Sequence, residues 1–285
     1  MKFLKNNFMY LIWFVIYFSI VWLVLGANRK AFLFTALIYG VSIGIALSPV
    51  GEWILRILES TRLPRTNEEK EYLLPIFQEV YQNALEKNPK LPKDIKIYII
   101  DANFVNAFAM GRKTIAVTIG AMKTFSPEQL KGVIAHEFGH ITYGHTKALL
   151  LSVVGNAIFS VIVIIARVFY WACEFLTGIF YGTSIFIAVI NILSFLTRII
   201  LDVVVMAFMY AGQIVLSLNS RINEFMADNF AYQMGLSEEL ISALYFLQKL
   251  GTQKMTMKQR MTASHPHIAE RIERLEGRTE TEAIV

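Results

Sequence analysis

The stretch "SPEQLKGVIAHEFGHITYGH", residues 126–145, decides the fold around it. Ser126 is a favoured N-cap residue, Pro127 suits the first helical turn, and Gln129 completes a capping box. The spacing predicts a helix that begins near Pro127 and runs through His140. The second half of this helix is apolar apart from two histidines and one glutamate, so the same segment also raises a question of chemistry.

His136 and His140 share one face of the predicted helix, because residues four apart are separated by about 40° of rotation. Both imidazoles can therefore reach one ion. Glu137 projects about 100° away from His136, beside such an ion rather than onto it. This is the H-E-x-x-H pattern, in which two histidines bind zinc and the glutamate handles the proton. We expect Gly139 to allow close approach by another backbone or by a substrate.

The alternative interpretation is a polar helix face beside a membrane. With five histidines in 285 residues, the pattern arises by chance in roughly fewer than one such chain per hundred. A glutamate charge buried in an otherwise apolar helix would also be costly if it had no partner. We therefore prefer the metal site.

A hydrolytic zinc ion usually has three protein ligands and an open position for water. "NSRINEFMADNFAYQMG", residues 219–235, places Glu224 and Asp228 four residues apart in a largely apolar surround. We expect Glu224 to bind zinc and Asp228 to accept the outer N–H of a ligating histidine, which fixes its tautomer. A solvated helix face is the alternative. The other candidates for the third ligand are His145, His265 and His267.

The composition indicates a membrane protein. Hydrophobic residues make up 55% of the chain and charged residues only 17%, whereas soluble domains are about a quarter charged. The single cysteine, Cys173, rules out an intrachain disulfide. The formal net charge is +5, and the basic residues gather near apolar segments. This distribution suits anionic lipid and does not indicate nucleic acid as a partner.

Four apolar segments are expected to cross the bilayer. Residues 8–26 and 31–50 contain no charge, and each is long enough to span roughly 30 Å of hydrocarbon. No small-x-small cleavage site follows the first segment, so a retained anchor is preferred over a signal peptide. The third span is expected at residues 148–166. The fourth lies within residues 183–218, at either 183–204 or 199–218.

A small α+β domain is expected outside the bilayer. Residues 68–86 carry apolar residues at helical spacing and predict an amphipathic helix. Residues 219–275 show another helical pattern of the soluble type, and residues 276–285 look like a flexible polar tail. Short strands are predicted at "IKIYII", "NAFAM" and "TIAVTIG", residues 95–100, 106–110 and 114–120.

The metal site and the basic residues restrict the topology. Glu224 must share a side of the membrane with His136, so an even number of crossings separates them, and residues 199–218 must partly extend the fourth helix. Only two basic residues lie between the first two spans. Positive charge favours the cytoplasm, so the N-terminus and the domain are expected there. Five basic residues flank the outer ends of the first two spans: Lys2, Lys5, Arg56, Arg62 and Arg65.

The motifs "NAFAMG", "HEFGHITYGH", "SRINEFMADNFA" and "SHPHIAERI", in this order among the apolar segments, resemble the HtpX family. That family consists of membrane-integrated zinc metalloproteases related to the type I CAAX prenyl proteases. The resemblance spans nearly the whole chain. It implies an endopeptidase with one zinc ion per chain, held by His136, His140 and Glu224, with Glu137 as general base.

The resemblance also adds residues that spacing alone does not find. It places His265, from an H-P pair, and Arg271 at the active site, where either could stabilise the oxyanion. It places Asn106 on a substrate-binding edge strand. We expect the substrate to add along this strand, beside Ala107 and Phe108, by β-augmentation.

The expected fold is mainly α, with four transmembrane helices and a cytoplasmic α+β zincin-like domain that is split by the second helical hairpin. The resemblance implies cleavage of misfolded or damaged membrane proteins in a bacterial cytoplasmic membrane. The expected divisions are a transmembrane hairpin at 1–55, the first protease part at 56–147, the second hairpin with its helix extension at 148–218, the second protease part at 219–275, and the tail at 276–285.

Two other functions are weighed against this one. A non-catalytic scaffold or chaperone with structural zinc would normally close the site with four cysteine or histidine ligands. A prenyl-peptide protease would need a large intramembrane chamber, for which four spans are few. His145 stands about 140° from the ligand face if the helix continues, so we expect a polar helix end near the interface. We expect His267 to neighbour the site rather than to bind metal.

Overall fold

The computed structural model of the chain describes residues 26–150, 222–250 and 268–283, with a few helical positions between 12 and 23 and at residue 189. The third and fourth predicted spans and most of the first lie outside the described residues. His265 and His267 lie outside them as well.

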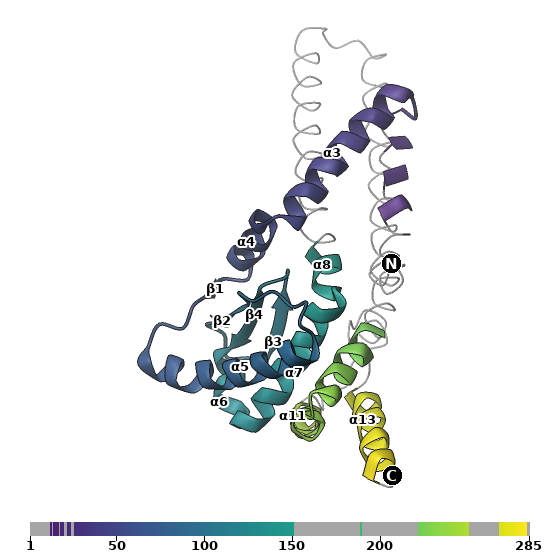
Figure 1. Cartoon of the computed structure of the whole chain (residues 1–285). Helices are drawn as coiled ribbons and strands as arrows, with labels where there is room; N and C mark the ends of the chain where they lie inside the picture. The colour runs from purple at the N-terminus through teal and green to yellow at the C-terminus, as the bar shows by residue number, and fades with distance from the viewer. Residues whose placement is uncertain are drawn as a thin grey trace.

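A four-stranded mixed sheet forms the centre of the described domain (Figure 1). Its strands are ordered β1-β2-β4-β3; β2 and β4 run parallel, and each outer strand is antiparallel to its neighbour. The three predicted strands are confirmed, whereas β1 escapes prediction because two residues carry no alternation. The bounds are Thr61–Arg62 for β1, Lys96–Ile100 for β2, Ala107–Met110 for β3 and Thr114–Thr118 for β4.

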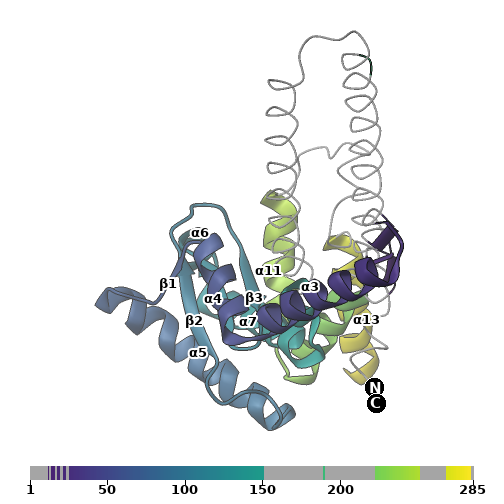
Figure 2. The ribbon, with the colours of Figure 1, turned by 90° about the horizontal axis from the view of Figure 1, so that it is seen from above.

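Helices cover one face of this sheet. α5 (Asn67–Lys87) contacts α7 (Pro127–Tyr143), which lies between α5 and α11 (Ser237–Leu250) (Figure 2). α11 in turn contacts α13 (Ile268–Ala283). The predicted amphipathic helix is thus confirmed as α5, and the residues of its inner face are buried as expected: Leu73, Ile76, Phe77, Val80, Tyr81 and Ala84. Two short helices flank the site-bearing segment, α6 (Ile119–Thr124) and α8 (His145–Leu150).

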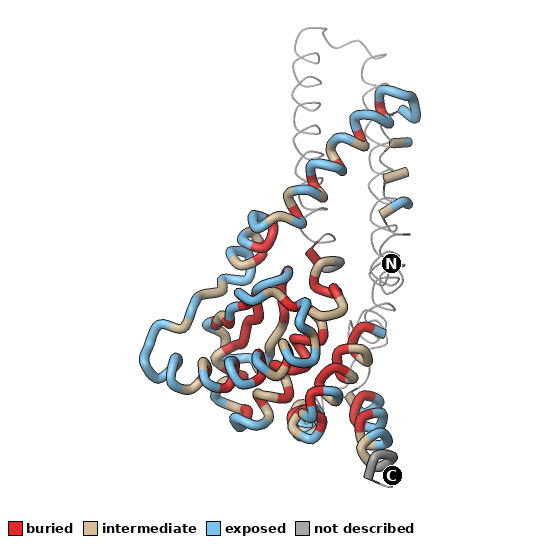
Figure 3. Tube along the Cα trace, in the orientation of Figure 1, coloured by how far each residue is buried: buried red, intermediate tan, exposed pale blue. Residues whose placement is uncertain are grey.

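Buried residues concentrate in the strands and in the helices beside them (Figure 3). Alternation along the strands divides this core into two clusters. Ile99 and Val117 face α5 and α7 in the larger cluster. Met110 and Ala116 point the opposite way and meet Leu55 in a smaller cluster on the other face. Burial on both faces fixes the position of β3, which contacts α7 along the sheet edge.

The predicted second span is α3 (Arg29–Leu47), the one helix in the described ranges that is long and apolar enough to cross a membrane. It ends before the predicted Val50. Ser48 leaves the helical conformation and caps α4 (Pro49–Leu58), whose first residue is a proline that cannot extend α3. The boundary predicted at residue 55 therefore falls inside α4, and the one at residue 147 falls inside α8.

The described part of the predicted tail at residues 276–285 is helical, as part of α13. Tyr245 in α11 donates a hydrogen bond to Glu276 at 2.7 Å, and Arg278 donates one to Asn229. Polarity alone suggested a flexible end, but these contacts tie the polar residues to neighbouring helices.

Candidate active site

α7 carries the H-E-x-x-H residues and is capped at both ends by its own sequence. Ser126 accepts the N–H of Gln129, and the Gln129 side chain accepts the N–H of Ser126. At the other end Gly144 adopts a left-handed conformation with a φ of 77°, which glycine tolerates because it lacks a Cβ. The predicted helix is confirmed and extends slightly further, to Tyr143.

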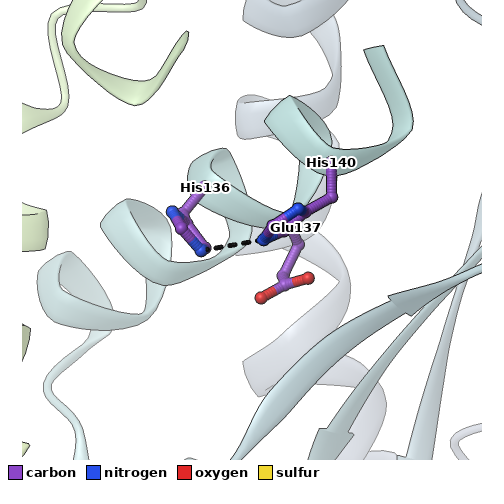
Figure 4. Close-up of side chains that lie close together, drawn as sticks. All are labelled: His136, Glu137 and His140. Carbon is purple, nitrogen blue, oxygen red and sulfur yellow. Dashed lines mark hydrogen bonds between the residues drawn. The ribbon is translucent and has the colours of Figure 1, made fainter. Parts of the chain in front are cut away.

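The two imidazoles of α7 face each other across one helical turn (Figure 4). Nε2 of His136 lies 3.1 Å from Nε2 of His140. Glu137 points away from the pair (Figure 4), and its Oε2 accepts the backbone N–H of Ala109 in β3 at 2.7 Å. One ligand atom from each of the three α7 residues lies within 4.8 Å of the others. Such a group could hold a metal ion.

Glu224 comes to this pair from a separate helix at residues 222–233. Its side chain is 3% exposed, with Oε2 3.3 Å from His136 Nε2 and Oε1 3.4 Å from His140 Nε2. A tetrahedral zinc ion with bonds of 2.0–2.1 Å would separate its ligand atoms by about 3.3 Å. The two nitrogens and one carboxylate therefore have the spacing that zinc requires.

Gly139 explains how the two helices come so close. A Cβ at this position would lie 2.7 Å from Cα of Ala227 and 2.9 Å from its carbonyl oxygen. No real side chain would fit there without moving the backbone. The expected close approach at Gly139 is thus made by another backbone, one helical turn from Glu224.

Asp228 and Arg271 form a buried layer behind His136 and Glu224. Oδ1 of Asp228 lies 2.8 Å from His136 Nδ1. Arg271 binds both oxygens of Asp228, at 2.9 and 2.6 Å, and its Nη1 lies 3.2 Å from Glu224. This two-point contact satisfies charges that would otherwise be costly to bury.

The charges in this layer shift the ionisation of its members. Burial and the charge of Arg271 act to lower the pKa of His136, but hydrogen bonds to Asp228 and Glu224 outweigh them and raise it to about 9. Burial acts to raise the pKa of Asp228, yet Arg271 and His136 bring it below its usual value. The raised pKa means that His136 readily takes up a second proton. This proton and a metal ion would compete for the lone pair on Nε2 of His136.

His145 lies closer to the histidine pair than its expected place at a polar helix end. It was expected at a polar helix end, but it is buried and its Nδ1 lies 3.1 Å from Nδ1 of His140. Burial, followed by the charge of His140, lowers the pKa of His145 to about 3, so its ring is neutral at physiological pH. The prediction assumed an unbroken helix, whereas the left-handed Gly144 redirects the chain. That glycine was the available signal.

β3 presents one edge to the site, because within the described residues it pairs only with β4. The N–H of Thr118 donates to the carbonyl of Asn106 at 3.0 Å, and hydrogen-bonded pairs alternate along an antiparallel ladder. Ala107 and Ala109 therefore turn their backbone groups away from β4, while Phe108 bonds toward it. Asn106 is exposed at the start of the strand.

The structure thus brings together most of the residues selected from the sequence: His136, Glu137, His140, Glu224, Asp228 and Arg271. The predicted edge strand lies beside them, joined through Ala109 and Glu137.

A protein-family model described as "Peptidase family M48" matches residues 68–279, which include the whole cluster. The chain belongs to this family. Its relatives include a Protease HtpX homolog of Bacillus pumilus, 24% identical over 89% of this chain and 88% of that protein. Protease HtpX of Ectopseudomonas mendocina is 26% identical over 88% of each chain. These findings confirm the expected HtpX-type metalloprotease.

Among solved structures, S. mikatae Ste24p matches 86% of this chain and 56% of its own, with 24% identity and a TM-score of 0.46.

Proposed function

We propose that the chain is a membrane-integrated, zinc-dependent endopeptidase. The observation that carries this proposal is the convergence of two imidazole nitrogens and one carboxylate at separations of 3.1–3.4 Å, next to Glu137. Three protein donors leave a coordination position for water, which is typical of a hydrolytic rather than a structural zinc site. Membership in a peptidase family supplies the reaction, cleavage of a peptide bond.

One zinc ion per chain would be held by Nε2 of His136, Nε2 of His140 and the carboxylate of Glu224. Asp228 accepts the Nδ1–H of His136, which leaves the Nε2 lone pair for the metal. Neutral His145 can accept the Nδ1–H of His140 in the same way. Each ligating ring therefore has its own outer partner.

Arg271 is best assigned to positioning. Its nitrogens contact Asp228 and Glu224, so it holds both carboxylates and offsets their charge. This position favours a supporting role over the oxyanion contact that the resemblance suggested for Arg271 or His265. His265 remains in the proposal as a donor to the oxyanion, on the basis of the resemblance.

Glu137 is proposed as the general base. A bound zinc ion supplies the acidity that makes a water nucleophilic near neutral pH. Glu137 takes the proton from that water and then delivers it to the leaving amine. The N–H of Ala109 holds its carboxylate between the ligand pair and β3, so the base stands where a peptide along β3 would meet the site.

The substrate is proposed to bind as an added strand on the edge of β3 that pairs with no other strand among the described residues. Ala107 offers a backbone N–H and carbonyl there, with Asn106 and Phe108 on either side. Backbone pairing accepts many side chains, so cleavage would be only weakly selective for sequence. This property suits an enzyme that removes damaged proteins.

The proposed setting is a bacterial cytoplasmic membrane with four spans, a cytoplasmic protease domain split by the second hairpin, and misfolded membrane proteins as substrates. α3 supports the second of these spans.

The test uses the full chain purified in detergent, loaded with zinc and given an unfolded model polypeptide. Glu137→Gln should retain stoichiometric zinc, measured by mass spectrometry of the metal, and lose cleavage. Glu128→Gln is the matched control because Glu128 is exposed near the start of the same helix, and it should cleave normally. Equal cleavage by Glu137→Gln would remove that residue from its role.

A further inference from the structure

α4 has two faces of opposite character, and the proposed chemistry uses neither. Four apolar side chains on its outer face are between 51% and 62% exposed: Val50, Trp53, Ile57 and Leu58. Its inner face buries Leu55 against the sheet cluster that contains Met110. An isolated helix of ten residues with so much exposed apolar surface would be unstable in water unless something covered it.

The position of α4 indicates what covers it. Only Ser48 separates α4 from α3, the candidate membrane span, and α4 lies at the foot of α3 next to the sheet (Figure 1). Leu47 at the end of α3 and Val50 at the start of α4 are both exposed apolar residues. A helix that leaves a span and keeps a tryptophan on its outer face matches the pattern of helices in the lipid head-group region.

Glu52 joins the inner face of α4 to the turn between β3 and β4. Its carboxylate is buried and accepts the N–H of Arg112 at 3.1 Å, the N–H of Lys113 at 3.2 Å and the hydroxyl of Thr114 at 2.6 Å. A Cβ on Gly111 would lie 2.6 Å from Glu52 Oε2, so the contact is tight. A buried carboxylate is stable only with such donors, so these hydrogen bonds hold the turn against α4.

We propose that α4 lies in the head-group region of the bilayer, with Val50, Trp53, Ile57 and Leu58 in contact with lipid, and that Glu52 thereby fixes the β3–β4 hairpin at the membrane surface. The partner is the lipid surface itself, and this part does not depend on peptidase activity. Only the description of β3 as the substrate strand rests on the proposed function. The consequence would be that peptides are received close to the bilayer.

The lipid contact is tested with single-cysteine variants in a Cys173→Ser background, reconstituted as the full chain in phosphatidylcholine–phosphatidylglycerol vesicles. A nitrobenzoxadiazole label at Trp53→Cys or Ile57→Cys should show blue-shifted emission and roughly twofold quenching by lipid that carries a shallow doxyl group. The same label at Glu71→Cys, on the exposed face of α5, should not be quenched. Labels at 53 and 57 that behave like the label at 71 would overturn the proposal, and would point to a protein partner instead.

The coupling is tested by Glu52→Gln, which replaces one carboxylate oxygen by an NH2 group that donates hydrogen bonds and cannot accept one. Amide exchange in the 111–114 turn should accelerate by about tenfold, while label quenching at position 57 stays unchanged. Glu59→Gln makes the same change at an exposed position at the end of α4 and should leave exchange unaltered. Equal exchange in the two variants would show that Glu52 does not hold the turn.

Discussion

The two helices that meet at the proposed zinc site are specified in different ways. α7 is defined locally, by the capping box of Ser126 and Gln129 and by the four-residue spacing of its histidines. The helix at residues 222–233 carries its acids at the same spacing, but it reaches α7 through contacts distant in sequence. Spacing within one helix encodes which donors share a face, whereas tertiary packing decides whether two such faces meet.

The largest expected effect comes from the ligand on the second helix. Glu224→Gln removes the one anionic ligand of the proposed set of three, so zinc affinity should fall by more than the about 10- to 100-fold typical of outer partners. A competition titration with a fluorescent chelator measures this. Glu273→Gln, an exposed change on α13, should match the unaltered chain. An unchanged affinity for Glu224→Gln would mean that the two helices do not share an ion.

Gly139→Ala disturbs the contact between α7 and the helix at residues 222–233 and leaves the proposed ligands unchanged. The added methyl group would meet the backbone at Ala227, so stability should fall by about 1–3 kcal/mol and zinc binding should weaken as Glu224 moves away. Denaturant unfolding in detergent gives the first quantity. Gly277→Ala in α13 meets no atom within 4 Å and should be neutral or stabilising by up to about 1 kcal/mol. Similar results for both would mean that the close approach is not needed.

Ser126→Ala weakens only the local definition of α7. Loss of the cap should cost about 1 kcal/mol of unfolding free energy, and the zinc affinity of the folded protein should not change. Ser126→Asp should restore stability, because aspartate caps comparably. If zinc affinity fell together with stability, the cap of α7 would also contribute to the contact between the two helices.

The smallest expected change in stability concerns Glu69, whose side chain both caps α5 and pairs with Arg62 outside that helix. Glu69 completes the capping box of α5 and binds Arg62 at 2.6 Å. The Arg62 hydrogen bond, followed by the N–H of Arg65, lowers the pKa of Glu69 from 4.5 to about 2. Its stabilisation is therefore complete above pH 4.5 and lost as the pH falls through about 2.

This partly exposed pair should contribute less than about 1 kcal/mol near neutral pH. Thermal unfolding of the metal-free protein should give a higher Tm for the unaltered chain than for Glu69→Gln at pH 7. This difference in Tm should become smaller below pH 4.5. A Tm difference that increased on acidification would contradict the lowered pKa of Glu69.

The sequence was sufficient for elements that follow a simple period. The helix at 68–86, the helix starting at Pro127 and three strands were predicted because each has enough residues to show its pattern. Within the site, the pairs His136–His140 and Glu224–Asp228 were found for the same reason.

What could not be predicted depends on turns and on burial. The end of α3 at Leu47 depends on Ser48, which caps α4. Hydropathy alone does not predict this cap, because the apolar stretch continues past it. His145 returns toward His140 only because Gly144 is left-handed. Arg271 was selected by resemblance alone, since its partners Asp228 and Glu224 lie far away in the sequence.

The central claim is that donors from two separately specified helices bind one zinc ion. X-ray absorption at the zinc edge of the purified, metal-loaded chain addresses it directly. The prediction is two imidazole nitrogens and oxygen ligands at about 2.0–2.2 Å, with the oxygen shell altered in Glu224→Gln and preserved in Glu137→Gln. A sulfur ligand, an oxygen shell that is unchanged in Glu224→Gln, or the absence of bound zinc would contradict this claim.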